Sequence, residues 1–204
     1  MTGMFFFCEK LKSLDFSSFD FQNVFNVSLM FQGCKELEEI KIIKFNATKV
    51  KNFSRMFYDC ENLKQLKPIQ TSNAINMEEM FFACRSLTEL DLSCFNTKNV
   101  KSMKSMFKSC ESLKKLDLFS FNTSNVEEME SMFENCINLE IINLSSFNTT
   151  KVISMERIFT NCKKLISLDL SSFNTPNIKI TKEMFQNCGK FKIKDFPNIK
   201  DCGN

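Results

Sequence analysis

Val100-x-x-Met103-x-x-Met106-Phe107-x-x-Cys110-x-x-Leu113-x-x-Leu116-Asp117-Leu118 is the stretch that decides the fold, because variants of it recur along the whole chain. Eight cysteines mark the recurrence: Cys8, Cys34, Cys60, Cys84, Cys110, Cys136, Cys162 and Cys188. Every interval between them is 26 residues except the 24 that separate Cys60 from Cys84. A phenylalanine stands three residues before each of these cysteines. A register kept over eight copies predicts a repeat protein.

The spacing of the apolar residues changes within one copy, and this change predicts two elements. From Val100 to Cys110 they recur every three or four residues, which predicts a helix of about three turns that Thr97 or Asn99 caps. Beyond Leu113 the spacing falls to two, which predicts a short strand with one buried side. The Ser-Phe-Asn-Thr stretch that follows predicts a turn.

One helix and one short strand cannot bury their apolar sides alone, so the copies must stack. We therefore expect an α/β, leucine-rich-repeat-like solenoid of about eight coils in a single domain, 1–204. Helices need about 8–10 Å of spacing against about 4.8 Å for strands, which predicts a parallel sheet on the concave side and short helices on the convex side. The expected repeats are 4–29, 30–55, 56–79, 80–105, 106–131, 132–157, 158–183 and 184–204, the last with a C-terminal cap.

The composition excludes several kinds of chemistry. The chain has no histidine and four glycines, so no imidazole base, no histidine-containing zinc site and no glycine-rich phosphate loop is available. We expect no enzyme, no cofactor and no metal. The formal charge of +3 is spread along the chain, which argues against nucleic acid as the main partner. No apolar run approaches the roughly 20 residues of a membrane span, so no membrane insertion is expected.

The repeat also resembles a known family. Leu113-x-x-Leu116-x-Leu118 is similar to the leucine-rich-repeat strand motif, and Met-Phe-x-x-Cys-x-x-Leu-x-x-Leu-Asp-Leu-Ser-Ser-Phe-Asn-Thr resembles the 26-residue repeat of BspA-like surface proteins. The resemblance runs from about Met4 to Cys188. It implies a cell-surface or secreted protein with a role in adhesion or protein recognition. The first residues do not form a signal peptide, which leaves the compartment unknown and a cytoplasmic protein or a fragment open.

The outward side of the strands is the expected binding surface for a protein or glycan partner, because it is wide and rigid. Its candidate residues are Glu89, Asp91, Lys115, Asp117, Phe119, Ile141, Asn143, Ser167 and Asp169. Phe119 and Ile141 either anchor a partner or, with a small displacement of the strand register, lie in the core. One strand position carries Asp15, Lys41, Lys67, Asp91, Asp117, Asn143, Asp169 and Asp195 in successive copies. Its carboxylates form either an ordinary solvated row or a cation or partner footprint.

The cysteines are expected to be small core side chains, since helices would hold neighbouring copies too far apart for disulfides. Cys94 and Cys202 stand outside this register and are either reactive thiols or plain exposed ones. The triplets Asn122-Thr123-Ser124 and Asn148-Thr149-Thr150 fit either glycosylation or turn chemistry.

The first copy predicts poorly covered Phe5, Phe6, Phe7 and Phe16, which indicates a truncation boundary or a self-association surface. The leading function is a non-enzymatic recognition module. The alternative is a structural subunit or spacer in a larger assembly. Thiol chemistry at Cys94 is the remaining opening for an enzyme.

Overall fold

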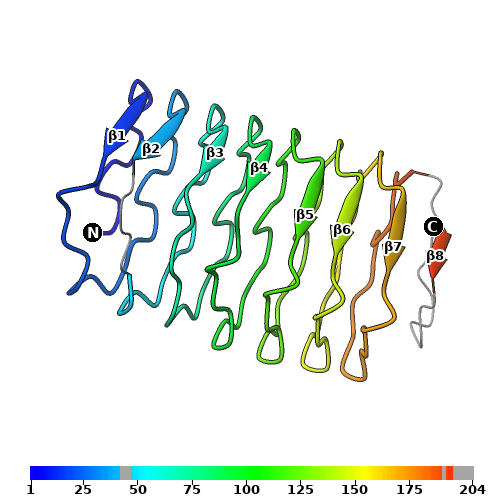
Figure 1. The fold of residues 1–204 in the computed structure, drawn as a ribbon. Helices are drawn as coiled ribbons and strands as arrows, with labels where there is room; N and C mark the ends of the chain where they lie inside the picture. Colours follow the sequence, from blue (N-terminus) through cyan, green and yellow to red (C-terminus); the bar gives the residue numbers. More distant parts are fainter. Residues whose placement is uncertain (42–46, 190–191, 195–204) are drawn as a thin grey trace.

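The computed structural model describes residues 1–41, 47–189 and 192–194. Each copy of the repeat makes one coil, and the coils stack side by side along one axis (Figure 1). Each coil carries one short strand: β1 (Ser13–Asp15), β2 (Glu39–Lys41), β3 (Gln65–Leu66), β4 (Glu89–Leu90), β5 (Lys115–Asp117), β6 (Ile141–Asn143), β7 (Ser167–Asp169) and β8 (Lys192–Lys194). The strands form parallel pairs, β1 with β2, β3 with β4, β5 with β6 and β7 with β8.

The helix prediction was wrong, because the described residues contain no helix. The stretch from Val100 to Cys110 and its counterparts form successive tight turns instead. In the second coil, Met30 N–H donates to Val27 O (3.3 Å) and Cys34 N–H donates to Phe31 O (3.0 Å). The third residue of each of these turns, Leu29 or Gly33, has a positive φ of 60° or 75°. This is the geometry of a type II turn, which leaves alternate backbone groups free to bond elsewhere.

Those alternate groups bond to the next coil. Leu29 N–H donates to Ser54 O (3.0 Å), Phe31 N–H to Met56 O (2.9 Å) and Gly33 N–H to Tyr58 O (2.8 Å). A helix satisfies its amides internally, whereas these turns satisfy half of them between coils, so the stacking itself holds the turns in place. Most of the positive-φ positions carry residues other than glycine. The left-handed conformation costs each such residue about 1–2 kcal/mol, and the inter-coil bonds must offset this cost.

The apolar side chains of the turns point inward and form columns. Phe31 lies flat on Phe57, with ring centroids 5.5 Å apart and an interplanar angle of 3°. The column continues through Phe81, Phe107, Phe133, Phe159 and Phe185 at centroid separations of 5.5 to 5.9 Å. This spacing is close to that of paired strands and far below that of packed helices. The wide helix spacing from which a concave strand side was predicted is therefore absent. The side of the stack that carries the strands is called the strand face.

A second set of bonds runs down the edge between the Ser-Phe-Asn-Thr corner and the turns. Isolated parallel bridges join Asn26, Asn52, Asn76, Ser102, Glu128, Ser154 and Ile180 in succession. Buried threonines support the same corner: Thr97 Oγ1 donates to Asn122 O (2.9 Å) and accepts from Asn122 N–H (2.8 Å). Thr97 thus fastens one coil to the next and caps no helix.

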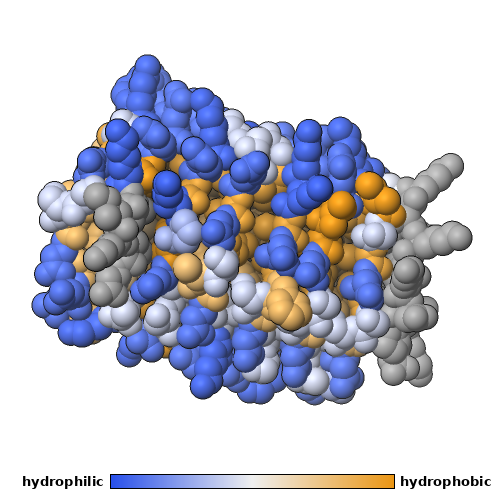
Figure 2. All heavy atoms as spheres, in the orientation of Figure 1, coloured by the Kyte–Doolittle hydropathy of each residue, from blue (hydrophilic) through white to orange (hydrophobic). Residues whose placement is uncertain are grey.

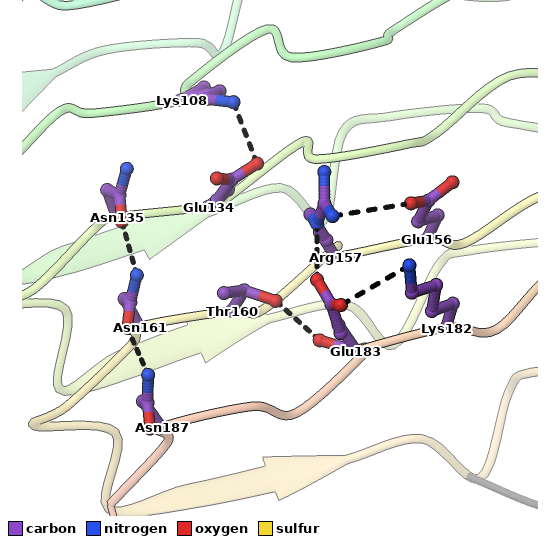
Figure 3. Close-up of polar contacts among 10 residues, drawn as sticks. All are labelled: Lys108, Glu134, Asn135, Glu156, Arg157, Thr160, Asn161, Lys182, Glu183 and Asn187. Carbon is purple, nitrogen blue, oxygen red and sulfur yellow. Dashed lines mark hydrogen bonds and ion pairs between the residues drawn. The ribbon is translucent and has the colours of Figure 1, made fainter. Parts of the chain in front are cut away.

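Polar side chains on the outside of the turns also link successive coils (Figure 3). Asn161 Nδ2 donates to Asn135 Oδ1 (2.7 Å), and Asn187 Nδ2 donates to Asn161 Oδ1 (3.0 Å). Arg157 Nε pairs with Glu183 Oε2 at 2.5 Å. These contacts repeat at the coil spacing, so they add lateral bonds to the wall that the turns form.

The ends of the stack match the expectations in part. Phe6 and Phe7 are 47% and 51% exposed, and Phe5 is half-buried against the core. Phe16, expected to be poorly covered, is 3% exposed because Phe5, Phe19, Phe21 and Phe31 surround its ring. Of the C-terminal cap, only β8 lies within the described residues.

Candidate functional site

The strand face presents the predicted side chains outward. In β5 the side chains of Lys115 and Asp117 are exposed, while Leu116 between them is buried. The same alternation places Glu89, Asp91, Ile141, Ser167 and Asp169 on the surface, with Asn143 half-buried. The strand register was therefore predicted correctly. Asp195 lies outside the described residues.

Phe119 and Ile141 are exposed, so they lie on the surface and not in the core. Phe119 is 66% exposed and Ile141 is 46% exposed. Ile166, which the sequence analysis did not single out, is 63% exposed beside β7. Lys114 and Glu140 occupy its position in the two preceding coils, and comparison of that column would have revealed an apolar residue at a polar position. Figure 2 shows apolar surface lying between hydrophilic side chains across the face that carries the strands.

The acidic row on the strand face builds turns. Asp117 Oδ1 accepts hydrogen bonds from Phe119 N–H (3.0 Å) and from Asn143 Nδ2 (3.0 Å). Asp91 Oδ1 likewise accepts from Ser93 N–H at 2.9 Å. Side-chain oxygens that bond two residues ahead form Asx turns, which end each strand and orient the following residue. Asp117 therefore positions the exposed Phe119.

The turn bonds of Asp15 and Asp91 favour the charged form of these two carboxylates. The hydrogen bond from Ser93 holds the pKa of Asp91 below its ordinary value, and Ser17 does the same to the pKa of Asp15. A carboxylate that accepts such bonds is stabilised in its ionised form. Among the residues that the structure describes, no group of three or more Asp, Glu or Cys is placed to hold a metal ion. The strand face is therefore a charged surface with its acids engaged in turns.

The pairing of strands is interrupted between β4 and β5, as it is between β2 and β3 and between β6 and β7. A hollow of about 590 Å³ lies between β4 and β5 and is lined by Thr88, Glu89, Leu90, Ser112, Lys114, Lys115 and Asp117. A second hollow of about 280 Å³ adjoins it and is lined by Leu90, Asp91, Leu92, Ser93, Asp117, Phe119 and Ser120. Five of the nine predicted residues line these two hollows: Glu89, Asp91, Lys115, Asp117 and Phe119. Ile141, Asn143, Ser167 and Asp169 lie on the coils that follow.

The column of cysteines is part of the core. Cys34, Cys60, Cys84, Cys110, Cys136 and Cys162 are fully buried free thiols. Each donates its S–H to a phenylalanine carbonyl of the preceding coil, as Cys110 Sγ does to Phe81 O at 3.1 Å. The core role was predicted correctly, but the stated reason was wrong, because the coils lie closer together than helices would allow. Burial raises the pKa of these thiols well above its ordinary value, as in Cys84 and Cys110, so they stay protonated.

The remaining sequence candidates have simple structural roles or lie outside the described residues. Cys94 is exposed. Cys202 falls beyond residue 194. Asn122 Oδ1 accepts hydrogen bonds from both the N–H and the hydroxyl of Ser124 (3.1 and 2.7 Å), and Asn148 does the same with Thr150 (3.0 and 2.7 Å). Both Asn-x-Ser/Thr triplets therefore form turns. The described part of the chain has no helix that could cross a membrane.

A family model matches almost the whole sequence of the chain. The model described as "Mycoplasma protein of unknown function, DUF285" matches residues 1–118 and 114–200. The chain belongs to this DUF285 family. Its repeats are BspA-like leucine-rich repeats, as the sequence motif indicated.

One solved structure shows the fold of this DUF285 chain, and a second resembles the chain less closely. The leucine-rich-repeat protein TpLRR of T. pallidum is 21% identical, with a TM-score of 0.54 over 80% of this chain and 69% of that one. A leucine-rich-repeat protein from Bacteroides ovatus ATCC 8483 is 15% identical, with a TM-score of 0.33 over 96% of this chain and 87% of that one. No curated protein matches the DUF285 chain. The first likeness shows a leucine-rich-repeat fold.

Proposed function

We propose that this chain is a non-enzymatic recognition module that binds a partner protein on its strand face, as an adhesion protein of the BspA-like kind does. The exposed Phe119 carries the proposal. Its ring is 66% exposed, yet the bond from its N–H to Asp117 fixes its backbone. An aromatic side chain held on a rigid backbone loses little conformational entropy on binding, which is typical of interface hot spots.

The surroundings of Phe119 fit a protein surface better than a small substrate. Ile141 and Ile166 add apolar contacts on the next two coils, while Lys115, Glu89 and Asp91 supply charges of both signs. Interfaces between proteins combine a few apolar anchors with a polar rim in this way. A glycan partner would use the same hydroxyl-rich hollow of Ser93 and Ser120. It would gain less from the two isoleucines.

The repeat supplies substitutions that test the proposal without disturbing the fold. Ser145 and Ser171 occupy the position of Phe119 in the next two coils. Lys114 occupies the position of Ile166 two coils earlier. Phe119→Ser and Ile166→Lys should therefore fold normally and lose the anchors. The matched control is Ile75→Lys, on another edge of the coil, where Lys101 occupies the equivalent position.

The experiment has two steps. The immobilised wild-type chain is exposed to extracts of the source cells and to the surface proteins of cells that they contact, and bound proteins are quantified by mass spectrometry. A protein retained by the wild type and by Ile75→Lys, and lost from Phe119→Ser with Ile166→Lys, is then purified and titrated. We expect at least a roughly tenfold weaker Kd for the double variant. Equal retention by all three chains would refute the proposal.

A structural subunit is the second candidate, and the first coil favours it. Met4, Phe6 and Phe7 of that coil are 49%, 47% and 51% exposed. An end of a solenoid that exposes apolar side chains can stack on another copy. Sedimentation velocity over a range of concentrations tests this: a dimer that Phe6→Ser with Phe7→Ser abolishes supports it. A monomer throughout counts against it.

A further inference from the structure

A second surface, separate from the strand face, runs along the corner of the coils. One residue of each coil forms a continuous row there, in the order Phe25, Lys51, Ile75, Lys101, Glu127, Ile153 and Lys179. Each N–H donates to the carbonyl of the preceding member at 2.8 to 3.1 Å. Lys49, Lys98 and Lys151 flank the row two or three positions earlier in their coils. These ten residues are called the basic edge.

The basic edge concentrates positive charge that is spread thinly elsewhere. It holds six of the 27 basic residues of the chain and one of its 24 acidic residues. All six lysines are exposed. Among the ion pairs of the described residues, which join Lys10, Lys35, Arg55, Lys64, Arg85, Lys108, Arg157 and Lys182 to acids, none involves these six. Glu128 follows Glu127 in the same coil, and Glu78 of an earlier coil lies within electrostatic range of Glu128. The six lysines of the edge outnumber these three carboxylates.

Apolar side chains alternate with the lysines in the same row. Phe25 is 59% exposed, Ile75 is 38% exposed and Ile153 is 41% exposed. Lys49 Nζ lies 6.0 Å from the centroid of the Phe25 ring, so cation and apolar group lie side by side. A nucleic acid or a sulfated glycan would use the charge and leave the isoleucines in contact with water. An interface that is anionic outside and apolar beneath would use both kinds of side chain.

Coils bonded at strand spacing place the seven members of the row over about 29 Å along the stack. The hydrogen bonds between successive members keep them in one continuous row. The row can therefore meet an extended surface along its length. Across the fifth, sixth and seventh coils, a hollow of about 290 Å³ is lined by Glu127, Lys151, Ile153, Asn177 and Lys179. Its two ammonium groups can face one anionic group.

We propose that the basic edge adsorbs to an anionic lipid bilayer, with the lysines at the phosphates and Phe25, Ile75 and Ile153 in the headgroup region. The chain lies on the membrane and spans nothing. This orientation leaves the strand face a separate surface, so membrane adsorption and partner binding succeed or fail independently.

Vesicle co-sedimentation tests the proposal. The full chain is mixed with vesicles of phosphatidylglycerol and phosphatidylcholine, or of phosphatidylcholine alone, at low and at physiological salt. We expect sedimentation with the anionic vesicles only, and less of it as salt rises. No binding to anionic vesicles, or equal binding to neutral ones, would overturn the proposal.

Substitutions taken from the repeat locate the surface. Glu127 shows that the row accepts glutamate, so Lys101→Glu with Lys179→Glu should fold and lower the partition coefficient more than roughly tenfold. Glu127→Gln should raise it. Lys115→Glu on the strand face is the control for a charge reversal elsewhere and should have a much smaller effect. An equal effect of the control would show that net charge alone, and no particular edge, governs adsorption.

A final variant separates a bilayer from a soluble polyanion. Ile153→Asn leaves the charge unchanged and should weaken vesicle binding severalfold, while its binding to heparin in the same buffer stays as in the wild type. Vesicle binding that is indifferent to Ile153→Asn, with heparin bound as tightly, would reject the lipid surface in favour of a general polyanion site. The unfolding midpoint of each variant by circular dichroism confirms that it is folded.

Discussion

The thiol of Cys110 donates a hydrogen bond to the carbonyl oxygen of Phe81, 3.1 Å away in the preceding coil. The same relationship joins Cys136 to Phe107 and Cys162 to Phe133. The cysteine therefore has two roles at this position: it fills a small space in the core and it binds a carbonyl of the neighbouring coil. This accounts for thiols that lie in register at close spacing and are all free.

Burial should protect the column of cysteines from alkylation. Burial raises the pKa of Cys34 and of Cys188 to about 11, and the pKa of the fully buried thiols also lies well above the ordinary value. At pH 8 we expect iodoacetamide to modify Cys8 and Cys94 rapidly in a Cys202→Ser background, and the buried thiols only after urea unfolding. Mass spectrometry of the peptides gives the order. Fast labelling of Cys110 in the folded chain would contradict the structure.

The stacked phenylalanines should dominate stability. Phe107 is fully buried between Phe81 and Phe133, at centroid distances of 5.7 and 5.9 Å. Phe107→Ala should lower the free energy of unfolding by about 3–5 kcal/mol, because it leaves a cavity and interrupts the column. Phe119→Ala removes the same ring from the surface and should change it by less than about 0.5 kcal/mol. Urea unfolding measures both, and similar losses would show that the ring of Phe107 is not buried.

Gly33 should resist substitution for two reasons. Its φ is +75°, and a Cβ built there would lie 2.7 Å from a ring carbon of Phe7. We expect Gly33→Ala to lower the free energy of unfolding by about 1–2 kcal/mol. Adding Phe7→Ala to the Gly33→Ala variant should restore the stability lost to the clash with the ring. The loss caused by the positive φ of residue 33 should remain. Thermal unfolding of the single and double variants separates the two, and an unchanged single variant would argue against both.

Acid should destabilise the chain. The Lys10, Lys64 and Arg157 side chains hold the pKa of Glu36, Glu38 and Glu183 below its ordinary value. A carboxyl with a lowered folded pKa stabilises the fold above its unfolded pKa, and this contribution is lost as the pH falls through the folded value. Desolvation raises the pKa of Glu78, so the protonation of this carboxyl in acid favours the folded state. We therefore expect the unfolding temperature to fall as the pH drops below about 4.

The carboxylates of the strand-face turns should add to the loss of stability in acid, because the pKa of Asp91 also lies below its ordinary value. Asn143 occupies the Asp position in β6 and makes the same turn to Ser145 N–H at 3.2 Å. Asp91→Asn should therefore keep the turn at neutral pH and reduce the loss of stability in acid. A variant as acid-sensitive as the wild type would show that the turn carboxylates contribute nothing to it.

The repeat, the parallel strands and the outward residues of the strand face were predictable, because a spacing of two has one structural meaning. The helices were not. Inward residues such as Val100, Met103 and Cys110 are spaced equally well for a helix and for a chain of tight turns. The distinguishing signal stands one residue before the cysteines, where Gly33, Asp59, Asn135, Asn161 and Asn187 occur. Gly, Asp and Asn tolerate positive φ, and they would have indicated turns.

The candidate site was predictable only as a surface. Alternation showed which side chains point outward, and it placed Lys115 and Asp117 correctly. The hollow between β4 and β5 depends on how two neighbouring coils pack, and no residue type in the sequence indicates it. The basic edge was missed because its lysines lie in different copies of the repeat, far apart in the sequence, and look evenly dispersed until the coils align them.

The 24-residue coil shows where such a protein tolerates changes in length. Its two missing residues fall just after β3, where Lys67 and Pro68 shorten the corner, yet the bridges from Asn52 to Asn76 and from Asn76 to Ser102 are intact. Insertions and deletions can accumulate on the strand side while the wall of turns keeps its period. New binding specificities can then arise from changes on the strand side of single coils. Whole coils can also be duplicated or lost, because the hydrogen bonds that the turns make between neighbouring coils are the same at each step.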